Sequence, residues 1–221
     1  MPDPHTAALA RFQRKRDELL AAARVVFTRE GYMGASMDAV AAEAGASKRT
    51  VYQYFEDKQQ LFAATVLDTV DRGYEYFKPR IQALAETNDV ESALHDLAHA
   101  GVISLMGPEL LKMRRLVIAE AERFPDIGRE YYERSWVRTL ALLAGTFKTL
   151  TERGLLRTPN PERAAYLFTW LYVSIPANRA AFLGDSAAGS RAQLIEDADE
   201  GVKVFLAAYG NPSQKAPARR D

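Results

Sequence analysis

Residues 36–55 read SMDAVAAEAGASKRTVYQYF and decide the fold, because they predict two short helices joined by a tight turn. Ser36 can cap the first helix, since its hydroxyl can accept an orphan backbone N–H, and Asp38 places negative charge in the first turn. Gly45 can end this helix, because glycine adopts the left-handed conformation without a Cβ clash. Small or apolar residues follow the i, i+3, i+4, i+7 spacing of one buried face: Met37, Val40, Ala41 and Ala44.

The second helix of the pair follows a capping residue, Ser47, and has a positively charged face. Val51, Tyr54 and Phe55 fall on the side of the first helix, so the outward positions are Lys48, Arg49, Tyr52 and Gln53. Arginine and lysine can donate to guanine O6 and N7, glutamine can pair with adenine, and hydroxyls can reach phosphates. The face therefore suits a DNA major groove, although a helical hairpin with a solvated basic face would show the same pattern.

Residues 36–45 and 47–55, with Lys58 and the pair Leu61-Phe62, resemble the DNA-binding signature of the tetracycline-repressor (TetR) family of bacterial transcription regulators. The resemblance covers about residues 13–73. It implies an all-α fold with an N-terminal helix-turn-helix domain at 10–73 and a helical ligand-binding and dimerisation domain at 74–210. The DNA-binding residues that it implies are Ser36, Ser47, Lys48, Arg49, Thr50, Tyr52, Gln53, Tyr54 and Lys58.

Two of these positions call for comment. Arg49 stands where many family members carry glycine or another small residue, which favours base readout there, while a phosphate contact is equally open. Lys58 follows a capping box, Asp57-Lys-Gln-Gln60, and so lies at a helix N-terminus. Its ammonium and the free backbone N–H groups there can hold a phosphate.

Charge and composition narrow the function classes. With 29 Lys+Arg and 29 Asp+Glu the chain is neutral, which argues against a nonspecific polycation. Residues 11–55 nevertheless carry eight basic and five acidic side chains. Cysteine is absent, which excludes disulfides, thiolate zinc sites and cysteine nucleophiles. The most apolar segment, 167–177, is too short and interrupted to span a bilayer, so we expect a cytoplasmic protein with no membrane contact.

Residues that cap, start or end helices predict nine helices, and no segment predicts a sheet. A disordered arm over residues 1–9 precedes a helix that begins at Arg11 and ends at Gly31, and Pro79 ends or kinks the helix that Asp57 opens. The remaining helices begin at Asn88 or Asp89, Pro108, Pro125, Pro161 after Asn160, and after Ser190; they end near Gly107, Phe124, Gly154, Gly184 and Gly210. Residues 211–221 form a polar, disordered tail.

The helix over 161–183 is apolar almost all round, which indicates burial on more than one side. One side can meet the domain core and another a partner subunit. The resemblance implies a homodimer in which the last two helices of each chain form a four-helix bundle. The interface residues expected from this arrangement are Leu171, Leu194, Val202 and Phe205, with a monomeric core helix as the alternative.

Aromatic residues concentrate between positions 124 and 172, and a helical bundle lined by aromatic side chains with a few polar groups is a plausible small-molecule pocket. The family resemblance places the inducer pocket in this part of the chain. The expected ligand-binding residues are Met113, Glu120, Tyr132, Trp136 and Trp170. Residues 118–125 resemble the corresponding segment of efflux-associated members, which favours an apolar or aromatic ligand.

His95 and His99 lie one helical turn apart with Asp96 between them, similar to the zinc-hydrolase motif of two histidines and a glutamate. Aspartate replaces the glutamate, and the third histidine of the chain is in the N-terminal arm, although an Asp or Glu elsewhere can be a third ligand. A histidine pair on a helix surface is the default interpretation. We therefore expect no metal, no cofactor and no catalytic residue, with a metal-dependent enzyme as the rival class.

Together these observations predict a dimeric regulator, most simply a repressor, that binds palindromic double-stranded operator DNA and is released by a small-molecule inducer. A helix-turn-helix protein that binds DNA without any ligand is the second alternative. The identities of the operator, the ligand and the regulated genes are not encoded in any motif of the chain.

Overall fold

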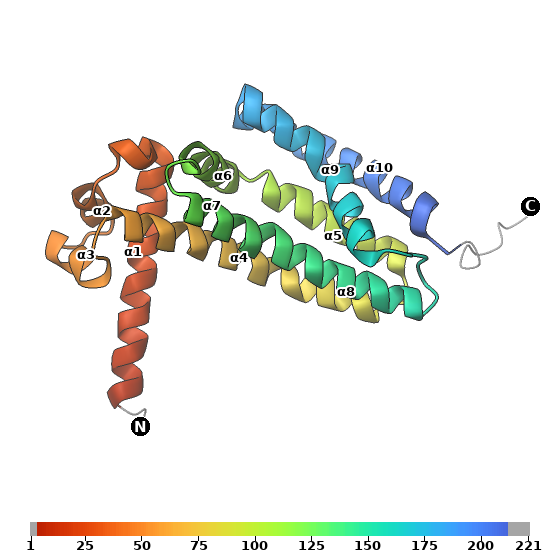
Figure 1. Ribbon diagram of the computed structural model, residues 1–221, viewed down its shortest axis with the longest axis horizontal. Coiled ribbons are helices and arrows are strands. Elements are labelled where there is room, and N and C mark those ends of the chain that lie inside the picture. Colours follow the sequence, from red (N-terminus) through yellow and green to blue (C-terminus); the bar gives the residue numbers. More distant parts are fainter. Residues whose placement is uncertain (1–3, 212–221) are drawn as a thin grey trace, which may run out of the picture. The chain divides into compact units, whose positions relative to one another are not determined.

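The computed structural model describes residues 4–211, and over this range it is built from helices joined by turns (Figure 1). The expected all-α fold is confirmed, and no strand occurs among these residues. The α-helices are α1 (Pro4–Gly34), α2 (Met37–Glu43), α3 (Lys48–Tyr54), α4 (Lys58–Glu86), α5 (Val90–Leu105), α6 (Pro108–Glu120), α7 (Pro125–Tyr132), α8 (Arg138–Glu152), α9 (Pro161–Leu183) and α10 (Arg191–Tyr209).

The ten α-helices agree with the predicted nine when contiguous helical segments are counted as one helix. A π-helical segment, Glu133–Val137, joins α7 to α8 without a break, so these three pieces form the one long helix expected after Pro125. The only other helical piece in the described range is a 3₁₀ turn, Asp185–Ala188.

Helix ends follow the capping residues read from the sequence. Asp89 accepts a hydrogen bond from the Ser92 backbone N–H at 3.1 Å, and Asn160 accepts one from Arg163 at 2.8 Å. Ser190 accepts one from the Gln193 N–H at 3.2 Å. Each cap satisfies an orphan donor of the first helical turn, which fixes where the helix begins.

One expected helix start is wrong, and one of the two alternatives at Pro79 is excluded. The first helix begins at Pro4 rather than Arg11, because residues 7–10, Ala-Ala-Leu-Ala, are strong helix formers; residues 1–3 of the expected arm lie outside the described range. Pro79 does not end α4, which continues to Glu86. Ile81 and Leu84, buried on the far side of the proline, hold that last part of the helix in a core. Of the expected tail, residues 212–221 also lie outside the described range.

The chain divides into two compact units. Of the described residues, unit 1 comprises 4–71 and 112–131, and unit 2 comprises 72–111 and 132–211. The first boundary lies close to the expected one at 73/74, but unit 1 also includes a segment from the middle of the chain. Unit 1 buries Phe27, Tyr32 and Phe62 in its core, and unit 2 buries Phe147, Phe168 and Phe205.

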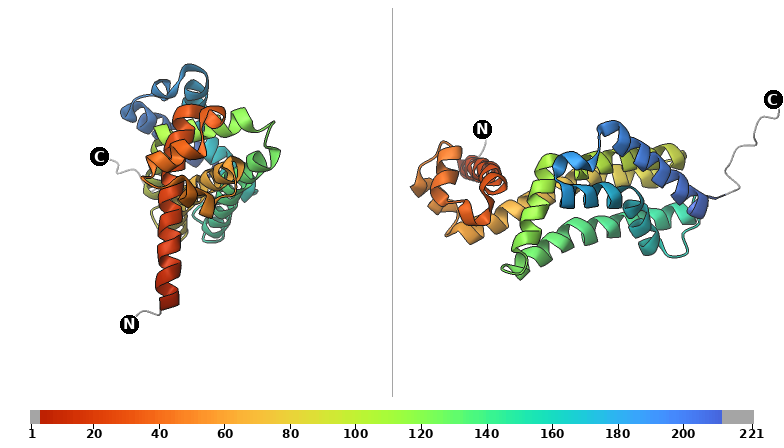
Figure 2. Two further views of the ribbon diagram at one scale, coloured as in Figure 1. Left: turned by 90° about the vertical axis from the view of Figure 1, so that its left-hand side faces the viewer. Right: turned by 90° about the horizontal axis from the view of Figure 1, so that it is seen from above.

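Within unit 2, α10 packs against α5 and α9, and α8 packs against α9 (Figure 2). Gly201 of α10 allows a close approach, since a Cβ atom added there would lie 3.2 Å from the Leu171 Cβ of α9. No helix within residues 4–211 is long and apolar enough to cross a bilayer.

Candidate nucleic-acid interface

The α2–α3 pair has the caps that the sequence predicted. The Ser36 hydroxyl accepts from the Ala39 N–H at 3.1 Å, and the Ser47 hydroxyl accepts from the Thr50 N–H at 3.0 Å. Gly45 in the turn has a φ of 56°, in the left-handed region that favours glycine. Both serine hydroxyls therefore fix where α2 and α3 begin. A serine hydroxyl that also contacts DNA would have to do so while it accepts its capping hydrogen bond.

The pair is held against the rest of unit 1 by its apolar face. Met37, Val40 and Ala41 of α2 are buried, as are Val51 of α3 and Phe55 after it. Because these residues are packed in the core, they fix the orientation of α3. The opposite face of the helix is therefore held toward solvent.

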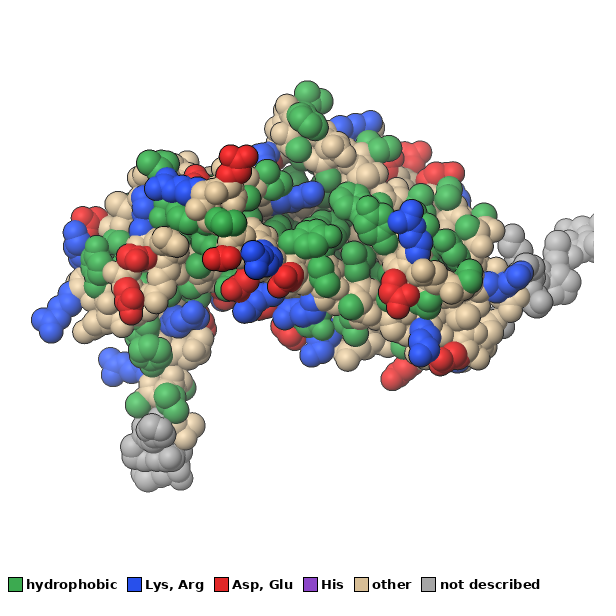
Figure 3. Space-filling view, viewed as in Figure 1, with side chains coloured by type: hydrophobic (Ala, Val, Ile, Leu, Met, Phe, Trp, Pro, Cys, Tyr) green, Lys and Arg blue, Asp and Glu red, His purple; other side chains and the backbone are tan. Residues whose placement is uncertain are grey.

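Four side chains occupy that outward face: Lys48, Arg49, Tyr52 and Gln53 are all exposed. The Lys48 ammonium lies 2.9 Å from Asp38 Oδ1 and 3.0 Å from Oδ2, and this hydrogen bond raises the pKa of Lys48. An ion pair between two exposed side chains is weak, so Lys48 can exchange Asp38 for a phosphate or a base edge. Lysine and arginine side chains project from the N-terminal helices on the face shown in Figure 3.

The N-terminal part of α1 extends this face, and its basic run at residues 11–16 had already indicated a contact with the DNA backbone near the groove. The Phe12 ring stacks on Tyr54 at a centroid distance of 4.5 Å, and Tyr54 is half-buried, as is Thr50. Arg11, Arg14 and Lys15 line an open hollow beside this ring pair. The sequence did not indicate the stacking of Phe12 on Tyr54, because the two residues are far apart in the chain.

Lys58 has a different environment from the one expected. Its ammonium donates to the carbonyl oxygens of Tyr32 and Ala35, each at 2.9 Å, and lies 3.4 Å from that of Met33. All three N–H bonds thus have acceptors inside unit 1, where they tie α4 to the end of α1 and to the residue that follows it. The expected phosphate contact from the Lys58 ammonium stays a prediction, since a phosphate would have to compete with these carbonyl acceptors.

The residues expected to bind a ligand are divided between the two units. Met113 is fully buried in the core of unit 1, and Glu120 belongs to the same unit, whereas Tyr132 of unit 2 is exposed. Trp136 and Trp170 lie together: their rings stack within unit 2 with centroids 5.3 Å apart and an angle of 9°. Met113 is a core residue in this structure, and its expected ligand contact stays a prediction.

The expected dimer residues need a correction. Leu194, Val202 and Phe205 are buried in the core of their own unit, so they are unavailable to a partner. Leu171 remains 37% exposed, and the same face of α9 exposes Ile175 at 57% and Phe182 at 83%. The faces of α10 were misassigned because its apolar stripe packs on α5 and α9 of the same subunit.

A cluster of two histidines and one aspartate belongs to unit 2. His95 Nδ1 and His99 Nε2 each lie 2.6 Å from Asp199 Oδ1. The hydrogen bond from His99, followed by the one from His95, lowers the pKa of the Asp199 carboxyl. The histidines are therefore not the simple surface pair of the default interpretation, and with Asp199 they are the residues that can hold a metal.

A capped helix pair, a buried inner face and an exposed basic outer face define a helix-turn-helix DNA-binding protein. Family models agree: residues 19–65 match the model of bacterial regulatory proteins of the tetR family, and residues 92–211 match the C-terminal domain of AefR-like transcriptional repressors. The chain belongs to the TetR family of transcription regulators.

Individual relatives span most of the chain. A solved TetR-family regulator from Mesorhizobium loti MAFF303099 is 42% identical, with a TM-score of 0.86, over 90% of this chain and 98% of that one. The flavonoid-responsive regulator FrrA is 27% identical with a TM-score of 0.67, over 90% and 99% of the two chains. The transcriptional regulator HbdR of Aromatoleum sp. (strain CIB) is 28% identical over 90% of this chain and 83% of its own length.

Proposed function

We propose that the protein is a homodimeric repressor that binds an inverted-repeat operator and is released by a small apolar or aromatic ligand. The observation that carries the DNA-binding part is the outward face of α3, where Lys48, Arg49, Tyr52 and Gln53 are all exposed. The match of residues 92–211 to a repressor domain supports the sign of regulation. No covalent chemistry is part of the proposal, and the site of action is the cytoplasm.

The contacts divide into two kinds. Arg49 and Gln53 have the donors and acceptors for base edges, and Lys48 and Tyr52 suit phosphates or bases at the margin of the groove. Arg11, Arg14 and Lys15, beside the Phe12–Tyr54 ring pair, suit the adjacent phosphate backbone. Thr50 and Tyr54 are half-buried, so their hydroxyls serve as supporting contacts.

The dimer surface that we propose is the outer face of α9, formed by Leu171, Ile175 and Phe182. These residues follow i, i+4 and i+11 spacing, which places them on one side of the helix. An exposed apolar row of this kind on a soluble domain is typical of a protein contact. Twofold symmetry in the protein then requires twofold symmetry in the operator, with recognition helices separated by about 34 Å or a multiple of it.

The ligand part rests on unit 2. The stacked pair Trp136–Trp170 provides a flat aromatic surface, and the buried Nε1 of Trp170 has no hydrogen-bond partner among the described residues. The Arg138 guanidinium lies 3.6 Å from the ring centre of Tyr74 in the same unit. Similarity to a flavonoid-responsive regulator favours a planar aromatic ligand. The helix-turn-helix protein that needs no ligand is the alternative.

Selection from a random duplex library, followed by fluorescence anisotropy on the winning sequence, tests the proposal. We expect an inverted repeat, bound at two chains per site, and a flavonoid panel that quenches the two tryptophans and weakens DNA binding. By linkage, the operator must weaken ligand binding by the same factor. A ligand that binds equally well with and without operator would contradict the induction mechanism. Selected sequences without an inverted repeat would contradict DNA binding by a symmetric dimer.

A further inference from the structure

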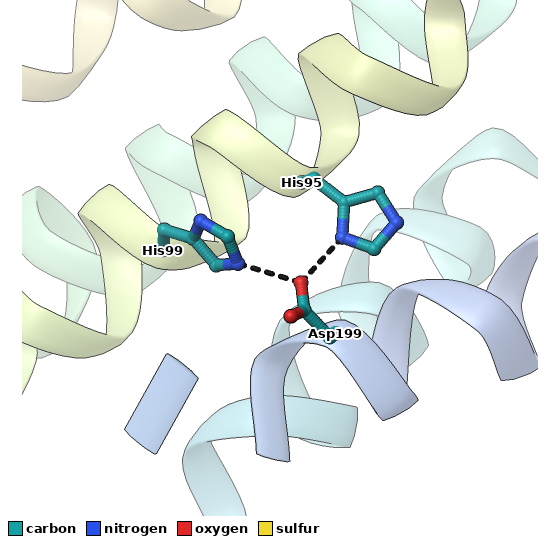
Figure 4. A group of neighbouring side chains, drawn as sticks. All are labelled: His95, His99 and Asp199. Carbon is teal, nitrogen blue, oxygen red and sulfur yellow. Dashed lines mark hydrogen bonds and ion pairs between the residues drawn. The ribbon is translucent and has the colours of Figure 1, made fainter. Parts of the chain in front are cut away.

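The cluster His95, His99 and Asp199 joins two helices that are far apart in the sequence (Figure 4). The histidines are four residues apart on α5, so both rings project from one face, and Asp199 faces them from α10. One carboxylate oxygen, Asp199 Oδ1, lies 2.6 Å from a nitrogen of each ring. The three side chains are 23%, 32% and 36% exposed, in the order His95, His99 and Asp199, so the cluster is reachable from solvent.

The spacing of the three candidate ligand atoms suits a single cation. All of them lie within 4.8 Å of one another. A tetrahedral zinc ion with ligands at about 2.0–2.1 Å holds its ligand atoms about 3.3 Å apart. A rotation of the Asp199 side chain that lengthens each 2.6 Å contact by about 0.7 Å would make room for the ion between the three groups. Rotamer adjustment of a partly exposed aspartate is sufficient, and neither helix has to move.

We propose that His95 Nδ1, His99 Nε2 and the Asp199 carboxylate form a binding site for one divalent transition-metal cation of the zinc type, joining α5 to α10. Two imidazoles and one carboxylate are ligands that Zn²⁺, Ni²⁺ and Co²⁺ accept, whereas Mg²⁺ and Ca²⁺ prefer oxygen ligands alone. Three protein ligands leave a fourth position open to solvent, so the ion can exchange. The site does not depend on the proposed repressor function.

The charges around the cluster favour a cation. Glu196, Asp197 and Glu200 share the adjoining turns of α10 with Asp199, and these four residues line an open hollow on that helix. Lys203, which also lines the hollow, is 3.7 Å from Glu200 and is partly neutralised by it. Asp96 is exposed on α5 next to His95. A cation approaching Asp199 thus meets mainly negative side chains, which raises its local concentration.

Binding should stabilise unit 2, because the ion would connect α5 and α10 only in the folded state. Their apolar faces are already packed in one core, through Leu94 and Ala98 of α5 and Ala198 and Val202 of α10. Metal in 100-fold excess over its Kd should raise Tm by roughly 5–10 °C for a chain of this size. Mg²⁺ at the same concentration should leave Tm unchanged.

The test uses the full chain without an affinity tag, treated with chelator and then dialysed. Calorimetric titration with ZnCl₂ should give one ion per chain, and CoCl₂ should produce the visible absorption bands of a site with nitrogen and oxygen ligands. His99→Ala and Asp199→Asn should each weaken zinc binding about 100-fold or more. His5→Ala removes the only other histidine of the sequence, and Asp96→Asn removes a neighbouring charge; both should leave affinity within a few-fold.

Absence of saturable binding by ZnCl₂, NiCl₂ and CoCl₂ would overturn the proposal and leave the cluster as a hydrogen-bonded bridge between α5 and α10. Binding that His99→Ala and Asp199→Asn do not weaken would overturn it equally. Circular dichroism of each variant establishes that it folds. If a site variant does not fold, histidine NMR signals of the wild-type protein decide: zinc should shift two of the three ring resonances, and a shift confined to His5 contradicts the site.

Discussion

The ammonium of Lys58 lies 2.9 Å from the carbonyl oxygen of Tyr32 and 4.6 Å from the centre of that residue's ring. A second carbonyl, that of Ala35, is equally close. One cation thus closes the end of α1 and the turn into α2, where carbonyl groups lack helical partners. Its position at the start of α4 is explained by this structural role without any contact to DNA.

We expect Lys58→Ala to lower the free energy of unfolding by about 2–3 kcal/mol, because two short charge-assisted hydrogen bonds and a longer one are lost, and the acceptors at Tyr32 and Ala35 are left partly buried. Urea denaturation measures the change. Lys48→Ala is the control, since both side chains of its ion pair with Asp38 are exposed and loss of the pair should leave stability unchanged within error. If Lys58→Ala leaves stability unaltered and lowers the salt dependence of DNA binding by about one unit of slope, Lys58 contacts a phosphate and the structural role is wrong.

Arg49 and Arg14 should affect DNA binding in different ways. Arg49→Ala is expected to cost about 1–3 kcal/mol on the selected operator and to relax preference at one base position. Arg14→Ala should weaken all sequences alike and lower the salt slope by about one. Anisotropy titrations on the operator and on single-base variants, at several salt concentrations, separate the two. Unchanged base preference in Arg49→Ala, with a smaller salt slope, would make residue 49 a phosphate contact.

Assembly should depend on the outer face of α9. Ile175→Asp places a charge in the proposed interface and should convert dimers to monomers in sedimentation velocity without loss of helical signal. Val137→Asp, on a similarly exposed residue of unit 2, should leave the dimer intact. Phe205→Asp should instead unfold unit 2, because its ring is fully buried. A wild-type chain that sediments as a monomer at micromolar concentration would contradict the dimer itself.

Gly101 of α5 makes room for a buried ring. A Cβ atom added there would lie 2.8 Å from the Tyr172 hydroxyl oxygen and 3.1 Å from its Cε2, so Gly101→Ala should destabilise the protein by about 1–3 kcal/mol. Combining it with Tyr172→Phe should cost less than the sum of the two changes, because the closest atom is removed. Gly145→Ala on α8, where nothing lies within 4 Å, should be stabilising by roughly 0.5–1 kcal/mol. Thermal unfolding of the four variants tests this coupling.

The features that the sequence predicted correctly depend on residues close together in the chain. The caps at Ser36, Ser47 and Asp89 and the outward face of α3 depend on neighbouring residues, and their geometry follows from helix periodicity. What it missed depends on distant contacts. Both faces of α9 are apolar, so periodicity alone does not tell which face meets the core and which meets solvent. The pairing of His95 and His99 with Asp199 spans about a hundred positions, and no local pattern indicates it.

The segment 112–131 has a consequence for how such proteins can be divided. Phe124, from this segment, packs against Tyr32 and Phe62 of the N-terminal helices, with centroids 4.7 and 6.2 Å apart. A fragment cut at residue 73 would therefore expose the aromatic core of unit 1 and lose Met113 and Val117 from it. To exchange DNA specificity between two such regulators, both segments of unit 1 have to be exchanged together. A single crossover would transfer the DNA-binding helices without part of their hydrophobic core.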